Sequence, residues 1–159
     1  MKCYSIILLL FCSFFSHGQV NSANIKIDSI TSLQLVREKF NPEINKLEIK
    51  NGFVLGINDS PLFGSDGEIP KYKLIKATLK IKDKSYNLQV DNMYNPWTGD
   101  QLNVNFFKII HSGENHHLLK CIFSDGAGSY SAYWKIEEKS SKREILSNDE
   151  KYFEWQLEN

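Results

Sequence analysis

Carboxylate and aromatic side chains concentrate in three polar stretches of the chain, at 58–71, 91–101 and 124–129. Carboxylates accept hydrogen bonds and bind cations, and Trp and Tyr rings stack on sugars or anchor protein interfaces. These chemistries belong to recognition more than to covalent catalysis. The candidate binding residues in or beside these stretches are Asp59, Phe63, Asp66, Tyr94, Trp97, Asp100, Asp125 and Tyr130.

Covalent catalysis has little support in the sequence. The chain contains no Gly-x-Ser-x-Gly and no His-Glu-x-x-His pattern, and no cysteine has an evident general base beside it in the sequence. We therefore assign no catalytic residue and expect a protein that is not an enzyme. A carboxylate pair for glycoside hydrolysis stays open, because the distance between two acidic side chains is invisible in a sequence.

Three patterns could hold an ion, and each has a simpler explanation. The run Asp66-Gly67-Glu68 offers oxygen ligands for calcium, but the EF-hand spacing is absent. The glycines of 124–129 are spaced like those of a phosphate loop, but no Lys-Ser/Thr follows them. His116 and His117 are adjacent on an expected strand and point to opposite faces, so we interpret them, with His111, as surface histidines. We expect neither a metal nor a cofactor.

The first eighteen residues have the pattern of a secretory signal peptide. Lys2 precedes an apolar run from Ile6 to Phe15, and Ser16-His17-Gly18 follows with small residues suited to cleavage after Gly18. The apolar run is far shorter than the roughly 20 residues needed to span a bilayer. A retained N-terminal helix is the alternative. Once 1–18 is removed, Cys121 is the only cysteine left, and its apolar neighbours predict a buried strand position.

Charge and composition restrict the class of partner. The 19 basic and 19 acidic side chains leave no net charge, which argues against a nucleic-acid binder. Lysine outnumbers arginine 17 to 2, a bias typical of AT-rich bacterial genomes, so we expect a periplasmic or secreted protein. We expect its partner to be an exported protein or a glycan, and we expect no transmembrane segment in 19–159.

The rest of the chain, 19–159, predicts one β-rich domain. Thr31 to Phe40 is expected to form an N-terminal helix, because Thr31 and Gln34 fit a capping box and Leu33, Val36 and Phe40 share a helical face. After Pro42 the apolar period changes to two, which is typical of strands. Asn148 to Glu158 is expected to be a short C-terminal helix or a final strand. The eight expected strands are 45–50, 53–57, 72–82, 85–90, 102–111, 116–123, 130–137 and 142–146.

Short turns between consecutive strands require antiparallel neighbours. We therefore expect a mainly β fold, all-β or α+β, in which an antiparallel meander of about eight strands forms a small barrel or a two-layer sandwich. Four tight turns alternate with the three polar stretches along the chain. In a meander this alternation places the three polar loops at one end and the tight turns at the other. The alternative is that the loop aromatics pack back against the rim.

The run from Ser124 to Trp134 resembles a Ser-Asp-Gly-rich turn before an aromatic strand in the periplasmic lysozyme-inhibitor families. Those families are small antiparallel barrels that block a wall hydrolase with loop residues, and their paired cysteines are missing from this chain. The resemblance implies protein binding. We expect an exported binding module of the inhibitor or immunity type that uses loops 58–71, 91–101 and 124–129. A carbohydrate or lipid carrier and a small secreted hydrolase are the alternatives.

Overall fold

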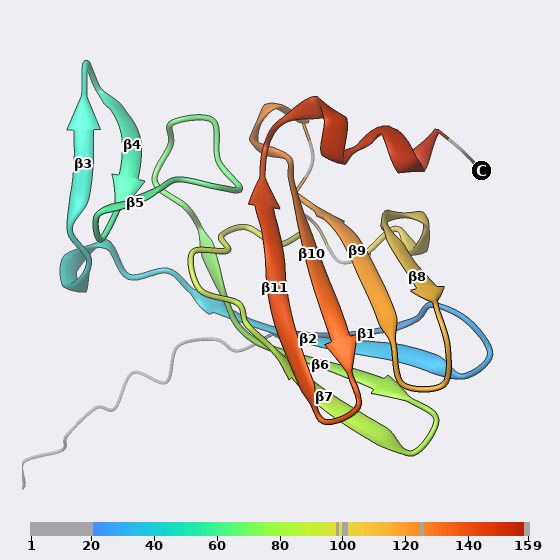
Figure 1. The fold of residues 1–159 in the computed structure, drawn as a ribbon. Helices are drawn as coiled ribbons and strands as arrows, with labels where there is room; N and C mark the ends of the chain where they lie inside the picture. Colours follow the sequence, from blue (N-terminus) through green and yellow to red (C-terminus); the bar gives the residue numbers. More distant parts are fainter. Residues whose placement is uncertain (1–20, 98, 100–101, 125, 158–159) are drawn as a thin grey trace, which may run out of the picture.

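The computed structural model describes residues 21–97, 99, 102–124 and 126–157, so the expected signal peptide at 1–18 lies outside the described residues. The fold is mainly β, and every strand pair is antiparallel (Figure 1). Short 3-10 turns, labelled η, complete it. The elements are β1 (Asn21–Lys26), β2 (Thr31–Lys39), η1 (Pro42–Ile44), β3 (Leu47–Lys50), β4 (Phe53–Ile57), β5 (Ser60–Pro61), β6 (Tyr72–Ile81), β7 (Lys84–Leu88), η2 (Val104–Phe106), β8 (Phe107–His111), β9 (His117–Phe123), η3 (Gly126–Gly128), β10 (Tyr130–Glu137), β11 (Ser140–Ser147), η4 (Glu150–Tyr152) and η5 (Glu154–Gln156).

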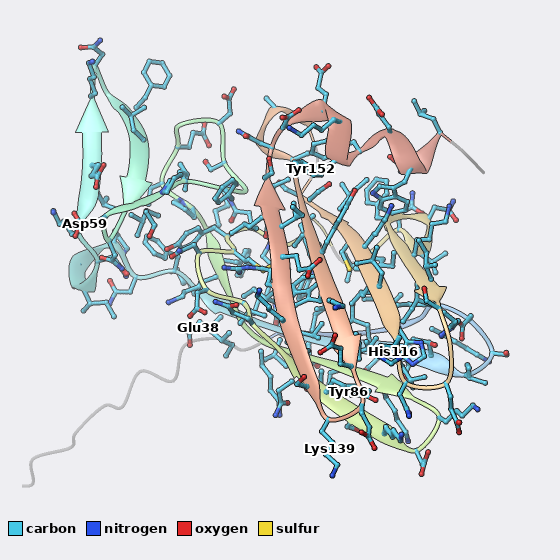
Figure 2. The ribbon with its side chains drawn as sticks, viewed as in Figure 1. Glu38, Asp59, Tyr86, His116, Lys139 and Tyr152 are labelled. Carbon is cyan, nitrogen blue, oxygen red and sulfur yellow. The ribbon has the colours of Figure 1, made fainter. Side chains whose placement is uncertain are left out.

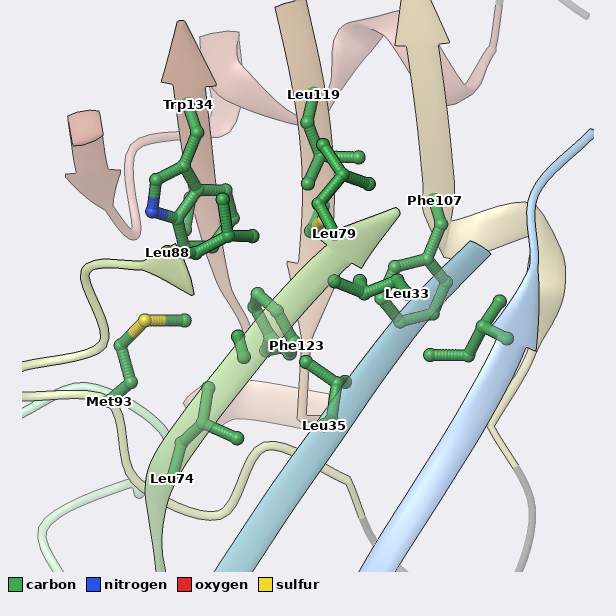
Figure 3. Packing of buried hydrophobic residues seen from close by; sticks show 14 of the residues in the cluster. Leu33, Leu35, Leu74, Leu79, Leu88, Met93, Phe107, Leu119, Phe123 and Trp134 are labelled. Atoms are coloured by element: carbon green, nitrogen blue, oxygen red, sulfur yellow. The ribbon is translucent and has the colours of Figure 1, made fainter. Parts of the chain in front are cut away.

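Two four-stranded sheets, in the orders β1-β2-β6-β7 and β11-β10-β9-β8, enclose one hydrophobic core. Leu33, Leu35 and Leu79 from the first sheet pack with Leu119 and Trp134 from the second (Figure 3). Each of these side chains is at most 1% exposed. We expected either a small barrel or a two-layer sandwich; the strands of the described residues belong to separate sheets that do not close into a barrel, so the fold is nearer to the sandwich.

The segment expected to be an N-terminal helix is strand β2. Leu33, Val36 and Phe40 fit helical spacing, but burial along β2 alternates residue by residue from Thr31 to Arg37. β2 pairs with β1 on one side and with β6 on the other. The helix prediction failed because residues 21–26 show no strand pattern in the sequence, so a partner strand was not expected there. The apolar spacing of 31–39 is compatible with helix or strand, and pairing with β1 and β6 fixes it as a strand.

A third, smaller sheet accounts for part of the difference between about eight expected strands and the eleven in the described residues. It has the order β3-β4-β5, and its buried residues Val54 and Ile57 join Phe40 and Tyr94 in a second core. The expected Asn51-Gly52 turn joins β3 to β4, and both residues have positive φ, 52° and 84°. Such a turn matches the twist of the strands it connects.

The C-terminal segment follows the helical alternative, as the two successive 3-10 turns η4 and η5. Asp149 accepts the capping hydrogen bond, from the backbone N–H of Lys151 at 3.2 Å. The hydroxyl of Tyr133 donates to the carbonyl of Tyr152 at 2.6 Å, and Trp155 is buried. This segment is therefore fixed onto strand β10.

Two further expectations concern single features of the described residues. Cys121 is fully buried in the core, as expected, and burial raises the pKa of its thiol well above the usual value. No helix in the described part of the chain is both long and apolar enough to cross a bilayer.

Candidate functional site

The three polar loops converge on one cleft of about 760 Å³. Loop 58–71, loop 91–101 and loop 124–129 each supply part of its wall, and β1, β2 and β6 supply its floor. The expectation that these loops share one end of the molecule is thus confirmed. The residues that line the cleft are Asn21, Arg37, Gly64, Ser65, Asp66, Glu68, Ile69, Lys71, Tyr72, Asn95, Trp97, Gly99, Ser124, Ala127 and Gly128.

Asn95 joins two of the loops through its side-chain amide. Its Oδ1 accepts hydrogen bonds from the backbone N–H groups of Lys71 and Tyr72, at 2.9 and 3.0 Å. Its Nδ2 donates to the carbonyl of Gly64 at 2.8 Å. Asn95 has a φ of 39°, in the left-handed region that Asn tolerates better than most residues. One side chain therefore fixes loop 91–101 against loop 58–71.

Two glycines allow the loops to approach at backbone distance. Gly64 has a φ of 86°, and a Cβ placed there would lie 1.9 Å from the carbonyl oxygen of Tyr94. A Cβ on Gly128 would lie 2.8 Å from the backbone nitrogen of Ser65. Side chains at Gly64 and Gly128 would force the three loops apart, so Gly128 serves loop packing, whereas a Cβ on Gly126 would meet nothing within 4 Å.

Arg37 forms the floor of the cleft and is only 5% exposed. Its guanidinium lies between two aromatic rings, 4.0 Å from the centroid of Tyr72 and 4.1 Å from that of Trp97. It also donates hydrogen bonds to the carbonyl of Trp97 and, at 3.5 Å, to that of Gly99. A planar cation stacked between two rings is strongly favoured away from water. Arg37 thus holds loop 91–101 onto β2 and β6.

Sequence reasoning missed Arg37 because the segment was expected to be a helix. A signal was present, since Arg37 is one of only two arginines and continues the alternating series Thr31, Leu33, Leu35. A charged residue at an inward strand position needs partners. If the segment had been predicted as a strand, Arg37 would have been identified as a charged residue at an inward position.

Three of the expected binding residues lie beneath the loops and support them. Tyr130 is fully buried, its hydroxyl donates to the carbonyl of Tyr94 at 3.0 Å, and its ring stacks on Phe123 with centroids 5.5 Å apart. Burial raises the pKa of Tyr130 well above its usual value. Tyr94 is 2% exposed, and Phe63 packs against the Tyr130 ring at 6.0 Å. Tyr94 and Tyr130 are therefore closed to a partner, and Phe63 is partly buried.

The other expected binding residues are distributed unevenly. Asp66 and Trp97 line the cleft, although Trp97 is only 6% exposed. Asp59 does not join them, because it pairs with Lys46 beside the small sheet (Figure 2). Asp100 and Asp125 lie outside the described residues. Asp66 is therefore the exposed candidate that the described loops bring to the cleft.

We expected all four tight turns at the end opposite the polar loops, and one of them does not lie there. The β6–β7, β8–β9 and β10–β11 turns lie together, but the β3–β4 turn lies on the side of the polar loops (Figure 1). The backbone N–H of Val54 donates to the carbonyl of Gly67 at 2.7 Å, which ties this hairpin to loop 58–71. The alternation of turns failed here because β3 and β4 leave the two large sheets.

Of the three expected surface histidines, His111 and His116 are exposed, and His111 connects the buried His117 to Asp28. Nδ1 of His111 lies 2.9 Å from Nδ1 of His117, and Nε2 of His111 lies 3.0 Å from Oδ2 of Asp28. His117 is buried, so its interpretation as a surface residue is wrong. Burial first, and then the neighbouring His111, lowers the pKa of His117. Within the described residues no group of three or more His, Cys, Asp or Glu side chains is placed to hold a metal.

The cleft offers mixed charge and many hydrogen-bonding groups. Arg37 and Lys71 contribute positive charge, and Asp66 and Glu68 contribute negative charge. The hydroxyl of Ser65 donates to the carbonyl of Glu68 at 2.7 Å, so it serves the loop fold. The arrangement suits a polar, uncharged or zwitterionic segment that can pair with both signs.

Comparison of the chain with family models, with curated proteins and with solved structures finds no significant match.

Proposed function

We propose that the protein is an exported β-rich binding module of the inhibitor or immunity type, which receives a projecting segment of another protein in its three-loop cleft. The observation that carries this proposal is the convergence of three loops on a polar cleft of about 760 Å³. Sites for ligands are concave and carry a few fixed polar groups among their lining residues. The pattern of residues 1–18 supports export.

The rigidity of the cleft supports a binding role. Asn95 and the stack of Arg37 with Trp97 fix the loops before any partner arrives. A site that is already ordered loses less conformational entropy when it binds, which raises affinity for a given set of contacts. Binding residues on loops are effective when a rigid scaffold holds them, and the two-sheet core is such a scaffold.

The alternative functions have weaker support from the same residues. A sugar that stacks on Trp97 would need an exposed ring face, whereas this ring is 6% exposed and Arg37 covers one face. A lipid carrier needs an apolar interior space, whereas side chains from both sheets fill the core. A hydrolase needs a base near a nucleophile, and the described contacts of the Ser65 hydroxyl are within its own loop.

The test compares variants that change charge or volume at the cleft and elsewhere. Asp66→Lys reverses an exposed charge at the cleft, and Ala127→Trp fills its mouth. Glu138→Lys makes the same charge change in the exposed β10–β11 turn and serves as the control. Each variant would be used as bait in cell-envelope extract, with quantitative mass spectrometry of the bound proteins. We expect a stoichiometric partner that both cleft variants lose and the control retains.

The proposal fails if every protein bound by the wild type is retained by both cleft variants. Export is tested separately by the mass of the protein recovered from the periplasm or medium. Cleavage after Gly18 predicts a mature chain that begins at Gln19. A full-length chain confined to the cytoplasm would contradict export.

A further inference from the structure

Strand β3 forms the outer edge of a hairpin that projects from the rest of the molecule (Figure 1). In the small sheet β3-β4-β5 it stands at the end of the order, with β4 on one side. The strand is short, from Leu47 to Lys50, and it is joined to β4 by the Asn51-Gly52 turn. Its outer backbone groups therefore form the side of the small sheet that faces away from β4.

The hairpin exposes an unusual amount of apolar surface for its size. Ile49 is 58% exposed, Phe53 59% and Leu55 55%. Natural edge strands are commonly protected by bulges that twist the edge away. Here the bulge falls between Glu48 and Ile49 in the pairing and inserts the extra residue, Leu55, on β4. The extra residue of the bulge therefore lies on β4 and not on the outer strand β3.

The outer strands of the two large sheets have contacts with the opposite sheet or its turns. At one side the hydroxyl of Ser141 on β11 donates to the carbonyl of Asn87 on β7 at 2.6 Å. At the other side His111 on β8 contacts Asp28 in the turn between β1 and β2, at 3.0 Å. These contacts tie β11 to β7 and one end of β8 to the β1–β2 turn, whereas β3 projects beyond both sheets (Figure 1).

The charges along β3 are complementary to those of a second copy of β3 that lies antiparallel to it. Alternation puts Glu48 and Lys50 on one face and Ile49 on the other. If two copies pair antiparallel with a twofold axis at Ile49, Glu48 of each copy lies opposite Lys50 of the other, and the two Ile49 side chains meet. Opposite charges at such positions stabilise a strand pair.

Neighbouring registers are less favourable. Residues directly opposite one another in an antiparallel pair point to the same face of the sheet, whereas neighbours along a strand point to opposite faces. The twofold axis must therefore pass through a residue of β3 and cannot fall between two residues. An axis at Glu48 opposes two glutamates and pairs Lys46 with Lys50, and an axis at Lys50 opposes two lysines. An axis at Leu47 pairs Lys46 with Glu48, which are opposite in charge, but it draws Lys46 away from Asp59, with which Lys46 forms an ion pair. Like charges therefore disfavour the registers at Glu48 and Lys50, and the ion pair of Lys46 with Asp59 favours Ile49 over Leu47.

We propose that β3 is a self-association surface, through which two copies of this chain join the small sheet of each into one continuous antiparallel sheet. The pairing satisfies the outer backbone groups of β3 and buries Ile49 against Ile49 of the second copy. This inference is independent of the function proposed for the cleft, because it uses other residues and another readout.

The test follows the oligomeric state by sedimentation velocity and light scattering from low micromolar to millimolar protein. We expect a concentration-dependent dimer for the wild type. Glu48→Lys alone and Lys50→Glu alone should each weaken the dimer by about tenfold or more, because both create like-charge pairs. An equimolar mixture of the two variants should associate again, and so should the double variant Glu48→Lys/Lys50→Glu. Glu138→Lys, in a remote turn, should leave the dimer unchanged.

Each of the other outcomes overturns the proposal. A wild type that is monomeric at millimolar concentration excludes self-association. Single variants that dimerise as well as the wild type, or a mixture that stays monomeric, exclude this edge and this register. All substituted positions are exposed, and circular dichroism of each variant checks that the fold is retained.

Discussion

Replacement of Arg37 tests whether the cation between the two rings holds the candidate site together. Arg37→Met keeps most of the volume of the side chain and its apolar stem but removes the guanidinium. The variant loses the stacking on Tyr72 and Trp97, worth about 2 kcal/mol when it is shielded from water. It also leaves the carbonyl of Trp97 without its charged donor, a loss of about 1.5–3 kcal/mol.

These contributions act on the same group and do not add fully, so we expect a loss of about 3–4 kcal/mol in the free energy of unfolding. For a chain of this size that corresponds to a fall of roughly 10 °C in Tm. Arg37→Lys keeps the charge but loses the planar stack, and we expect about half of the effect. Urea denaturation followed by circular dichroism measures both variants.

Lys76→Met is the matched control, because Lys76 is an exposed cation on the neighbouring strand β6. We expect it to change the free energy of unfolding by less than about 0.5 kcal/mol. If Arg37→Met were as mild as this control, the stacked arginine would contribute nothing to the loops, and the account of a preorganised cleft would be refuted.

Three further variants test the loop contact, the histidine chain and the core. Gly64→Ala should destabilise the protein by at least about 2 kcal/mol in urea denaturation, because its Cβ overlaps the Tyr94 carbonyl. The control Gly126→Ala, whose Cβ would have nothing within 4 Å, should cost about 1 kcal/mol. Equal losses in the two variants would contradict the close loop contact. Folding lowers the pKa of His117 below its usual value of 6.5, so the unfolded chain binds the proton more readily than the folded chain. The free energy of unfolding should therefore fall as the pH drops through 6.5 and below. A His117→Asn variant with the same pH dependence of stability would argue against this assignment. Trp134→Leu should cost about 3 kcal/mol by leaving a cavity and an unpaired carbonyl at Gln89, and a thermal scan that shows no change would contradict the shared core of the two sheets.

The strands after Pro42 were predictable because their conformation follows from local pattern. The period of two from Tyr72 to Ile81 and the turn at Asn51-Gly52 both reflect backbone preferences that act over a few residues. The segment from Thr31 to Lys39 was mispredicted because its apolar residues fit both periods. Pairing with β1 and β6, which lie before and far after it in the chain, decided the conformation.

The candidate site was likewise predictable only in part. The sequence located the three loops, and the cleft confirms that they converge, although the alternation of turns that predicted this held only in part. It did not distinguish Asp66 and Trp97, which line the cleft, from Tyr94 and Tyr130, which support it from below. Burial of a loop aromatic depends on the neighbours that folding supplies, and those neighbours lie on other strands.

What the sequence alone determined is the mainly β class, most strand positions and the loops that meet at one end. The tertiary structure decided the division into three sheets, the strand conformation of β2 and the place of Arg37 between Tyr72 and Trp97. The reason is the range of the interactions. Turns and alternation act between near neighbours in the chain, whereas the stack at Arg37 joins residues 60 positions apart and exists only after the strands have paired.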